Sequence, residues 1–231
     1  MIRVRRSADR GHTQLSWLDS YHTFSFDHYY DQRFMNFGPL RVINEDYIEP
    51  GQGFGTHGHR DMEIITYVLA GALEHKDSLG NGSVIRPGEI QRMSAGSGIL
   101  HSEFNHSRTD KVHLLQIWIV PEVRNMEPSY DQRPFKLVPG QWQLVASKSP
   151  DPDAVCIQQE TDLYVATVDK GAVLSRSLQR PLAWLQVARG SISLGSEMLL
   201  AGDGVAIEQA ESLELEGRDR AEILLFEMER R

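Results

Sequence analysis

Residues 63–90 read EIITYVLAGALEHKDSLGNGSVIRPGEI, and this stretch decides the fold. It contains short apolar or alternating runs, rich in β-branched residues and separated by glycine turns, which are typical of β-strands. Asn81-Gly82 predicts a hairpin turn, because both central residues of a type I′ turn need positive φ. The stretch therefore predicts consecutive antiparallel strands.

The same pattern extends in both directions along the chain. Further strand-like runs are LRVINEDYI (40–48), VHLLQIWIV (112–120), LYVATV (163–168), LAWLQVA (182–188), SISLG (191–195) and EILLFEM (222–228). Long helical periodicity is weak throughout. Six of the ten prolines lie between Pro121 and Pro152, which indicates a connector. We expect an all-β protein with two domains, residues 1–125 and 126–231.

The two halves of the sequence also resemble each other. YVLAGALEH, IRPGEIQRMSAG and VHLLQIWI can be aligned with LQVARGSISL, LLAGDGVAIEQAE and EILLFEM. In this alignment Gly71 matches Gly190, and Gly88 matches Gly202. We interpret the similarity as an internal duplication. None of the nine histidines follows His113, so only the first half can hold a histidine-based metal site.

Composition restricts the partners and the location. The formal net charge is -8, and the only basic cluster is RVRR near the start, so direct nucleic-acid binding is disfavoured. Cys156 is the only cysteine, which excludes an internal disulfide and fits a reducing compartment. No window approaches the roughly 18 apolar residues of a membrane span. We expect a cytoplasmic protein with no membrane association.

Two pairs of metal-ligating residues stand out. His57 and His59 flank Gly58, and on a strand this spacing points both rings to one face. His101 and Glu103 repeat the spacing. On facing strands, the two pairs would supply three imidazoles and one carboxylate, which suits Fe, Mn, Co, Ni, Cu or Zn. This donor set leaves coordination positions open for substrate or water.

The fourth ligand has two candidates on spacing alone. Glu63 shares the parity of His57 and His59, whereas Glu103 is closer to a histidine in sequence. We interpret the other polar groups as structural: the histidines as solvated or hydrogen-bonded, and the acidic runs as solvated faces. They are His75, His106, His113, Glu45-Asp46 and residues 208–216.

Several of these positions together resemble the two cupin motifs. They are Gly51, His57, His59, Glu63, Pro87, Gly88, Glu89, Gly98, His101 and Asn105. Residues 25–105 are similar to the pirin family, specifically to its bacterial pirin-like quercetin 2,3-dioxygenases, and the similarity is dense from about residue 20 to 120. The chain departs from the general cupin pattern in the short spacing between His59 and Glu63, and in Gly96, where proline is common.

The resemblance implies a bicupin: two stacked antiparallel β-barrels with few short helices, of which only the N-terminal one binds metal. It implies the ligands His57, His59, His101 and Glu103, with Glu103 also the catalytic base. Glu63 would then orient a histidine. The implied cofactor is one divalent transition metal ion, Fe foremost, with Zn, Co, Ni, Mn or Cu as alternatives.

The implied activity is that of a quercetin 2,3-dioxygenase, which cleaves the central ring of a flavonol with dioxygen and releases carbon monoxide. Substrate would reach the metal through an apolar-walled pocket beside His57 and His101. Two other functions stay open. One is a non-catalytic, metal-containing regulatory protein with a protein partner, and the other is a cupin enzyme of different chemistry on an endogenous substrate.

Overall fold

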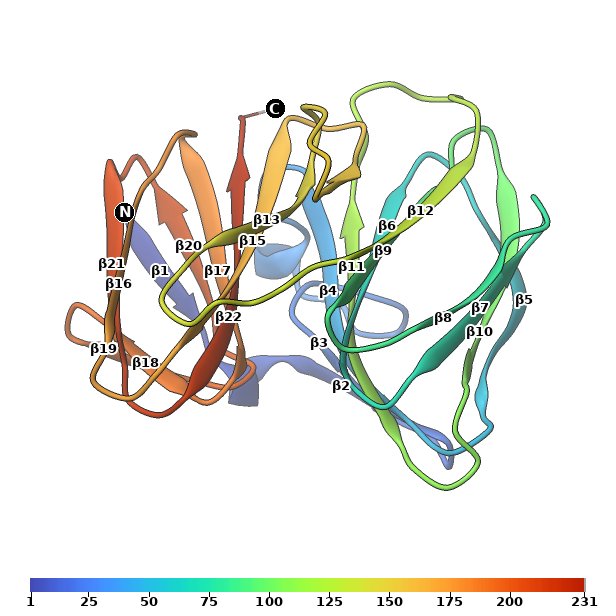
Figure 1. The fold of residues 1–231 in the computed structure, drawn as a ribbon, viewed down its shortest axis with the longest axis horizontal. Coiled ribbons are helices and arrows are strands. Elements are labelled where there is room, and N and C mark those ends of the chain that lie inside the picture. Colours follow the sequence, from blue (N-terminus) through green and yellow to red (C-terminus); the bar gives the residue numbers. More distant parts are fainter. Residues whose placement is uncertain (231) are drawn as a thin grey trace.

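The computed structural model describes residues 1–230, and in them almost all regular structure is β-strand. The helical elements of this part are two 3-10 helices, η1 (Ser7–Asp9) and η2 (Gln32–Phe34). No helix in the described residues is long and apolar enough to cross a membrane. Figure 1 shows two β-rich halves side by side, each built from a seven-stranded and a four-stranded sheet. The predicted all-β, two-barrel architecture is confirmed.

The first barrel comes mainly from residues 11–134. Its large sheet has the order β12-β9-β6-β11-β4-β3-β2. These strands are β2 (Gly11–Gln14), β3 (Leu18–His22), β4 (Leu40–Ile48), β6 (Glu63–Ala70), β9 (Glu89–Ser94), β11 (Val112–Ile119) and β12 (Ser129–Pro134). Its small sheet has the order β5-β10-β7-β8. These strands are β5 (Gly53–His59), β7 (Leu73–Asp77), β8 (Gly82–Ile85) and β10 (Ile99–Asn105).

The second barrel has the same plan. Its large sheet has the order β1-β20-β17-β22-β15-β13-β14. These strands are β1 (Ile2–Arg5), β13 (Gln143–Ser147), β14 (Val155–Cys156), β15 (Thr161–Val168), β17 (Leu182–Arg189), β20 (Gly204–Glu208) and β22 (Ala221–Met228). Its small sheet has the order β16-β21-β18-β19. These strands are β16 (Val173–Ser177), β18 (Ser191–Leu194), β19 (Glu197–Leu200) and β21 (Ser212–Gly217).

Sheet order confirms the internal duplication. The run β9-β6-β11-β4 of the first barrel corresponds strand by strand to β20-β17-β22-β15 of the second. The aligned glycines also share a backbone conformation. Gly71 and Gly190 have φ of 78° and 70°, and Gly88 and Gly202 have φ of 86° and 85°. This left-handed region favours glycine, so the matching glycines mark equivalent turns.

Each half contributes an edge strand to the large sheet of the other. β1 pairs antiparallel with β20, in the register Ile2 with Ile207. β12 pairs antiparallel with β9, in the register Ser129 with Ser94. Both exchanged strands cover an edge that would otherwise expose unpaired backbone groups. The boundary between residues 125 and 126 stays a prediction about folding units, since strand pairing does not test which segment folds alone.

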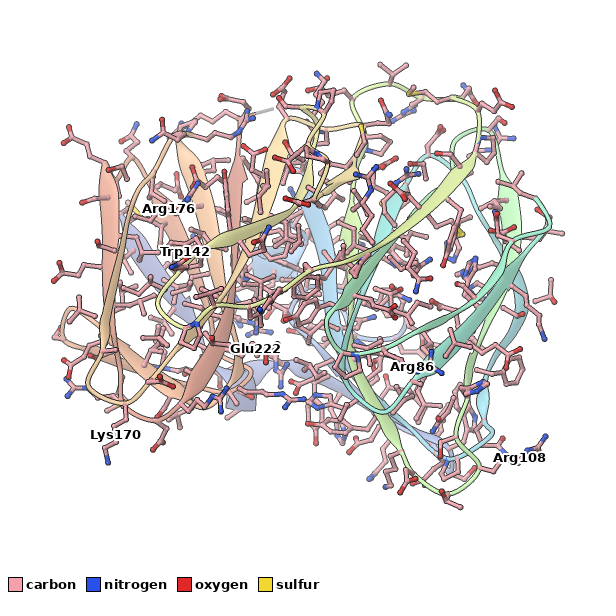
Figure 2. The ribbon with its side chains drawn as sticks, viewed as in Figure 1. Arg86, Arg108, Trp142, Lys170, Arg176 and Glu222 are labelled. Atoms are coloured by element: carbon pink, nitrogen blue, oxygen red, sulfur yellow. The ribbon has the colours of Figure 1, made fainter. Side chains whose placement is uncertain are left out.

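The two large sheets pack against each other through a shared apolar core. Residues from both halves form it, among them Ile43, Ile65, Ile117, Val165, Leu224 and Phe226. At one side of this contact the Tyr67 hydroxyl donates to Glu222, and Arg189 donates to the Leu69 carbonyl. Figure 2 labels Glu222 near the middle of the molecule, where the halves meet. Strands such as β6 are therefore buried on both faces, which explains their largely apolar sequence.

The hairpin between β7 and β8 exists, but its predicted turn type is wrong. The loop spans residues 78–81, closed by the Asp77 amide donating to the Asn81 carbonyl at 3.1 Å. Gly80 has φ of 90°, whereas Asn81 and Gly82 do not have positive φ. The Asp77 carboxylate accepts from the backbone amides of Leu79 and Asn81 at 2.9 and 3.1 Å. This side chain stabilises a longer loop than the Asn-Gly pair alone predicts.

Substitutions at Gly190 and Gly195 separate backbone strain from steric clash. Both have positive φ, but a Cβ at Gly190 would lie 2.3 Å from the Arg220 carbonyl oxygen, whereas Gly195 has nothing within 4 Å. We expect Gly195→Ala to cost on the order of 1 kcal/mol of unfolding free energy. Gly190→Ala should cost roughly 2 kcal/mol more, because backbone must move. Urea unfolding of both variants measures this, and equal losses would contradict the packing described at Gly190.

Candidate metal centre

Three histidine rings converge on the inner side of the small sheet of the first barrel. Strands β5 and β10 are hydrogen-bonded neighbours, and His57 is paired directly with His101. His59 lies two residues beyond His57 and faces the same way. One ring nitrogen of each histidine lies within 4.8 Å of the other two. His57 Nε2 is 3.0 Å from His101 Nε2. The histidines thus meet on adjacent strands of one sheet rather than on facing strands.

The protonation of these rings suits metal binding. His57 Nδ1 lies 2.8 Å from the Gly55 carbonyl, which can only accept, so Nδ1 carries the proton and Nε2 presents a lone pair. Burial first, and then the neighbouring histidines, lower the pKa of His59 to about 4 and that of His101 to about 3. Both rings are therefore neutral at pH 7. Neutral imidazoles with converging nitrogens are the donors that transition metals bind, so this group fits a metal ion.

Glu103 lies on the same strand as His101 and lines the same pocket as His57 and His59, but its carboxylate is outside the group of three ring nitrogens that lie within 4.8 Å of one another. A register shift in the pairing of β10 with β5 falls between His101 and Glu103. Gln116 Nε2 donates to both carboxylate oxygens of Glu103 at 3.0 Å. The Thr66 hydroxyl donates to the Gln116 carbonyl oxygen at 3.1 Å, which fixes the amide with its nitrogen toward Glu103. The carboxylate is thus buried and held in one orientation on the inner face of the barrel.

Glu63 lies at the start of β6, in the large sheet of the first barrel, and not in the small sheet that carries the histidines. The chain leaves β5 at His59, turns through Asp61 with φ of 49°, and enters β6 in the large sheet. The Glu63 carboxylate accepts a hydrogen bond from the Ser94 hydroxyl at 2.8 Å and one from the backbone amide of Gln158 at 3.3 Å. Burial raises its pKa. The parity argument fails because the strand is interrupted, and the expectation that Glu63 orients a histidine is wrong.

His75 is a buried histidine that the sequence analysis did not place at the site. Its side chain has 0% exposure, and its Nε2 lies 3.1 Å from a carboxylate oxygen of Asp77. Its Nδ1 lies 3.5 Å from His101 Nδ1, and its ring stacks on Tyr130. His75, His101 and Glu103 form a second group with donor atoms within 4.8 Å. The signal was the alternation in LEHKD, which gives His75 the parity of the buried Leu73.

Two further histidines, His106 and His113, have hydrogen-bonding partners away from the three converging rings. His106 lies 3.4 Å from a carboxylate oxygen of Glu74. His113 lies 2.9 Å from a carboxylate oxygen of Glu45 and stacks on Tyr47. The structural interpretation of these two residues is therefore confirmed.

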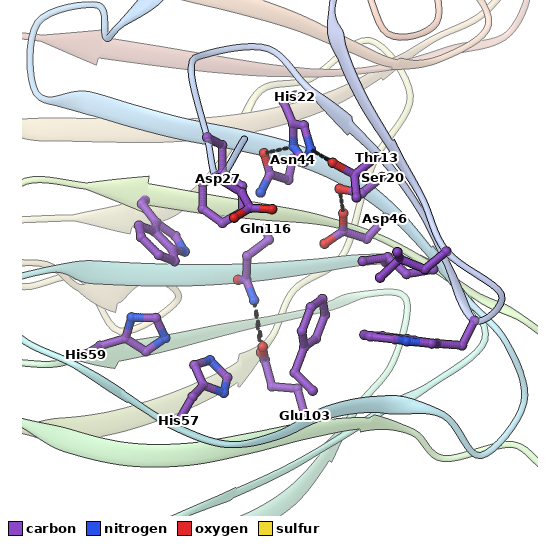
Figure 3. Close-up of a pocket in the computed structure, with 16 residues that line it drawn as sticks. Thr13, Ser20, His22, Asp27, Asn44, Asp46, His57, His59, Glu103 and Gln116 are labelled. Atoms are coloured by element: carbon purple, nitrogen blue, oxygen red, sulfur yellow. Dashed lines mark hydrogen bonds between the residues drawn. The ribbon is translucent and has the colours of Figure 1, made fainter. Parts of the chain in front are cut away.

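A pocket of ≈ 480 Å³ opens beside the histidines (Figure 3). Its apolar walls are Leu15, Trp17, Leu18, Phe26, Phe54 and Trp118. His57, His59 and Glu103 line it, whereas the buried His101 is not among the lining residues. The prediction of an apolar-walled pocket beside His57 is confirmed. Its volume and apolar walls suit a small organic molecule.

The opposite wall of this pocket is polar. We call Ser20, His22, Asn44 and Asp46 its polar end; they lie on β3 and β4 and are all buried. The Ser20 hydroxyl donates to Asp46, and His22 Nδ1 donates to the Asn44 carbonyl oxygen at 2.8 Å. Burial, aided by the charges of Glu103 and Glu45 and opposed by the hydrogen bond from Ser20, raises the pKa of Asp46 to about 7. Desolvation lowers the pKa of His22.

The sequence-based interpretation of Glu45-Asp46 is wrong. Glu45-Asp46 is not a solvated face, because Glu45 is 6% and Asp46 3% exposed. The two residues point to opposite sides of β4. Glu45 forms an ion pair with Arg10 at 2.8 Å, and Asp46 enters the pocket. The sequence signal for this burial was the position of the two acidic residues inside the apolar run LRVINEDYI. Burying an acidic side chain costs free energy unless it is paired or hydrogen-bonded.

Comparisons with known proteins agree with this geometry. Residues 2–119 match the family profile described as Pirin, and residues 144–228 match that of the quercetinase C-terminal cupin domain. The chain is 45% identical over 230 residues to a quercetin 2,3-dioxygenase of Escherichia coli K12, with 99% of both chains covered. It is 42% identical over 232 residues to a putative quercetin 2,3-dioxygenase of Mycobacterium tuberculosis, covering 98% of this chain and 95% of that one.

Solved structures show the same fold. The crystal structure of bacterial pirin YhhW from Escherichia coli in complex with nickel(II) has a TM-score of 0.94 and 44% identity, with 99% of both chains covered. The protein YhaK from Escherichia coli has a TM-score of 0.78 and 26% identity, covering 91% of this chain and 93% of that one.

The buried acid at the polar end predicts a pH-dependent stability. The pKa of Asp46 is raised by burial from its ordinary value of 3.8 to about 7, so its favourable contribution to stability is complete below about pH 3.8 and is lost as the pH rises through about 7. Asp46→Asn cannot ionise. Relative to wild type, its unfolding free energy should rise by on the order of 2 kcal/mol between about pH 5 and about pH 8. Urea unfolding at both pH values measures this, and a difference that does not change with pH would refute a buried, ionisable Asp46.

Proposed function

Because this chain belongs to the pirin family of cupin proteins, we propose that it is a metal-dependent dioxygenase that cleaves flavonols such as quercetin. The observation that carries the proposal is the convergence of three histidines beside an apolar-walled pocket that also holds the carboxylate of Glu103. The relatives named quercetin 2,3-dioxygenase support the choice of substrate.

We assign His57, His59, His101 and Glu103 as the metal ligands. One divalent transition ion bound there would supply Lewis-acid chemistry, which lowers the pKa of a bound hydroxyl, and reactivity toward dioxygen. Three imidazoles and one carboxylate accept Fe, Ni and their neighbours alike, and Fe is our first expectation. The nickel(II) complex of the Escherichia coli pirin supports a divalent transition metal.

The chain's own residues bind the flavonol and move one proton. Trp17, Phe54 and Trp118 form apolar walls that contact the flat rings and exclude water. The Glu103 carboxylate accepts the proton of the 3-hydroxyl group. Gln116 keeps this carboxylate directed into the pocket through its two hydrogen bonds. Both atoms of dioxygen enter the products, carbon 3 leaves as carbon monoxide, and the proton passes from Glu103 to the new carboxyl group.

The direct test is elemental analysis of freshly purified protein together with an oxygen-uptake assay on quercetin. We expect one metal ion per chain, and equal amounts of oxygen consumed and carbon monoxide released. Metal-loaded protein that neither consumes oxygen nor releases carbon monoxide with quercetin would refute the proposed activity.

Removal of a histidine at the centre should strongly weaken metal binding. We expect His57→Ala and His101→Ala to weaken metal affinity by more than roughly 100-fold. This exceeds the loss expected when only a residue that hydrogen-bonds a metal ligand is removed. His106→Ala is the matched control, because His106 contacts Glu74 and lies away from the pocket. Metal content after dialysis against a weak chelator measures this. Full metal retention by both centre variants would rule out the assigned ligands.

Glu103 and Glu63 should differ in their effects on turnover. Glu103→Gln keeps the shape but removes charge and basicity, so turnover should fall by roughly 10² or more, while the histidines retain much of the metal. Glu63→Gln should be milder, because its carboxylate contacts Ser94 and Gln158 rather than the pocket. Both variants are assayed at identical metal loading. The assignment fails if Glu63→Gln abolishes metal binding and turnover while Glu103→Gln behaves like wild type.

A further inference from the structure

We propose that Ser20, Asn44 and Asp46, at the polar end of the pocket, form a second recognition site that binds hydroxyl groups on the flavonol rings away from the metal ligands. This site would make the protein prefer polyhydroxylated flavonols over flavonols that carry only the 3-hydroxyl group. The inference rests on the proposed function and adds to it the features that a substrate must have at its far end.

The position of these residues follows from strand register. Ser20 is paired with Asp46 across β3 and β4, so both side chains point to the inner face of the barrel. Asn44 is paired with Gln116, whose amide reaches Glu103. Figure 3 shows Ser20 and Asp46 on the side of the pocket opposite the two histidines, with Glu103 and Gln116 between. A molecule that reaches from the histidines across the pocket therefore meets the polar end.

The polar end has hydrogen-bonding capacity that the described residues leave free. Asp46 accepts a hydrogen bond from the Ser20 hydroxyl at one carboxylate oxygen, Oδ1, although a carboxylate can accept at both. The side-chain carbonyl oxygen of Asn44 accepts from His22, which leaves the amide NH₂ available to donate. Together they offer an acceptor and a donor, which is what a phenolic hydroxyl group needs.

Burial makes this capacity energetically significant. A buried carboxyl group without enough partners pays a desolvation cost, and the pKa of Asp46, raised to about 7 mainly by burial, reflects it. A ligand hydroxyl that donates to Asp46 would offset part of that cost. A ligand without such a hydroxyl would leave the group unsatisfied, so it should bind more weakly.

The charge of the pocket narrows the ligand class further. Asp27, Asp46 and Glu103 line it, and no lysine or arginine within residues 1–230 does so. An organic acid would meet like charge without a cationic partner. The walls between the two ends are aromatic and aliphatic, including Trp17 and Phe54. The pocket thus suits a neutral, flat aromatic body with hydroxyl groups at its far end.

The test compares two ligands under anaerobic conditions, so that binding is measured without turnover. Quercetin carries hydroxyl groups on both outer rings, whereas 3-hydroxyflavone carries only the 3-hydroxyl group. Metal-loaded wild-type protein should bind quercetin at least roughly tenfold more tightly, as expected for a hydrogen bond to a charged group. Asp46→Leu should weaken quercetin binding by roughly tenfold or more and change 3-hydroxyflavone binding by less than about twofold.

Two further variants keep the test decisive. Ser20→Ala removes the hydroxyl that positions Asp46, and it should reduce the preference for quercetin by roughly threefold even if Asp46→Leu does not fold. Ser147→Ala is the matched control. Ser147 is equally buried, at 2% against 3% for Ser20, and donates to Asp162 in the other barrel, so its removal should leave the preference unchanged.

The outcomes separate this inference from the proposed activity. Equal loss of affinity for both ligands in Asp46→Leu, or no loss for either, would overturn the recognition site. Oxygen uptake with quercetin by a wild-type protein that shows no ligand preference would overturn the recognition site and leave the proposed activity standing. A ligand preference that depends on Asp46, without oxygen uptake, would support the recognition site and overturn the activity.

Discussion

The face-to-face packing of the two seven-stranded sheets is the contact on which the rest of the structure depends. It removes apolar side chains of both halves from water, and residues such as Ile117 and Leu224 have no exposure. Because this core uses the outer faces of β4 and β11, the inner faces of the same strands can carry polar groups. Asn44 and Gln116 lie there, in register, and Gln116 reaches across the barrel to Glu103. The wall that carries Gln116 and the polar end is therefore held rigid from behind, while the three histidines lie on the small sheet.

The duplicated halves carry different side chains at equivalent places. By sheet order, β16 of the second barrel corresponds to β5 of the first. Where β5 carries His57 and His59, β16 carries Arg176, which is ion-paired with the fully buried Glu227 and lies 3.5 Å from the ring centroid of Tyr164. Figure 2 labels Arg176 in this half. The second barrel thus has an ion pair where the first has the converging histidines, and it contributes to the molecule through packing and an exchanged strand.

Much of the fold and part of the site could be predicted from local patterns. Period-two alternation and glycine turns predicted the strands, and the matching glycines predicted the duplication, because both depend on residues close in sequence. The prediction of a two-residue turn at Asn81-Gly82 was wrong, because the side chain of Asp77 stabilises a longer loop. Glu63 was ambiguous because parity holds only along an unbroken strand, and the break after His59 moves it to another sheet.

The sequence by itself determined that the chain is an all-β duplication and that its histidines are confined to one half, because residue chemistry and strand periodicity are local properties. Only the tertiary structure decided which polar side chains meet. His75 comes against His101 because β7 and β10 are neighbours in the small sheet, and Asp46 enters the pocket while Glu45 pairs with Arg10 behind the wall. A strand has two faces, and which face lines the barrel depends on packing against segments far away in sequence.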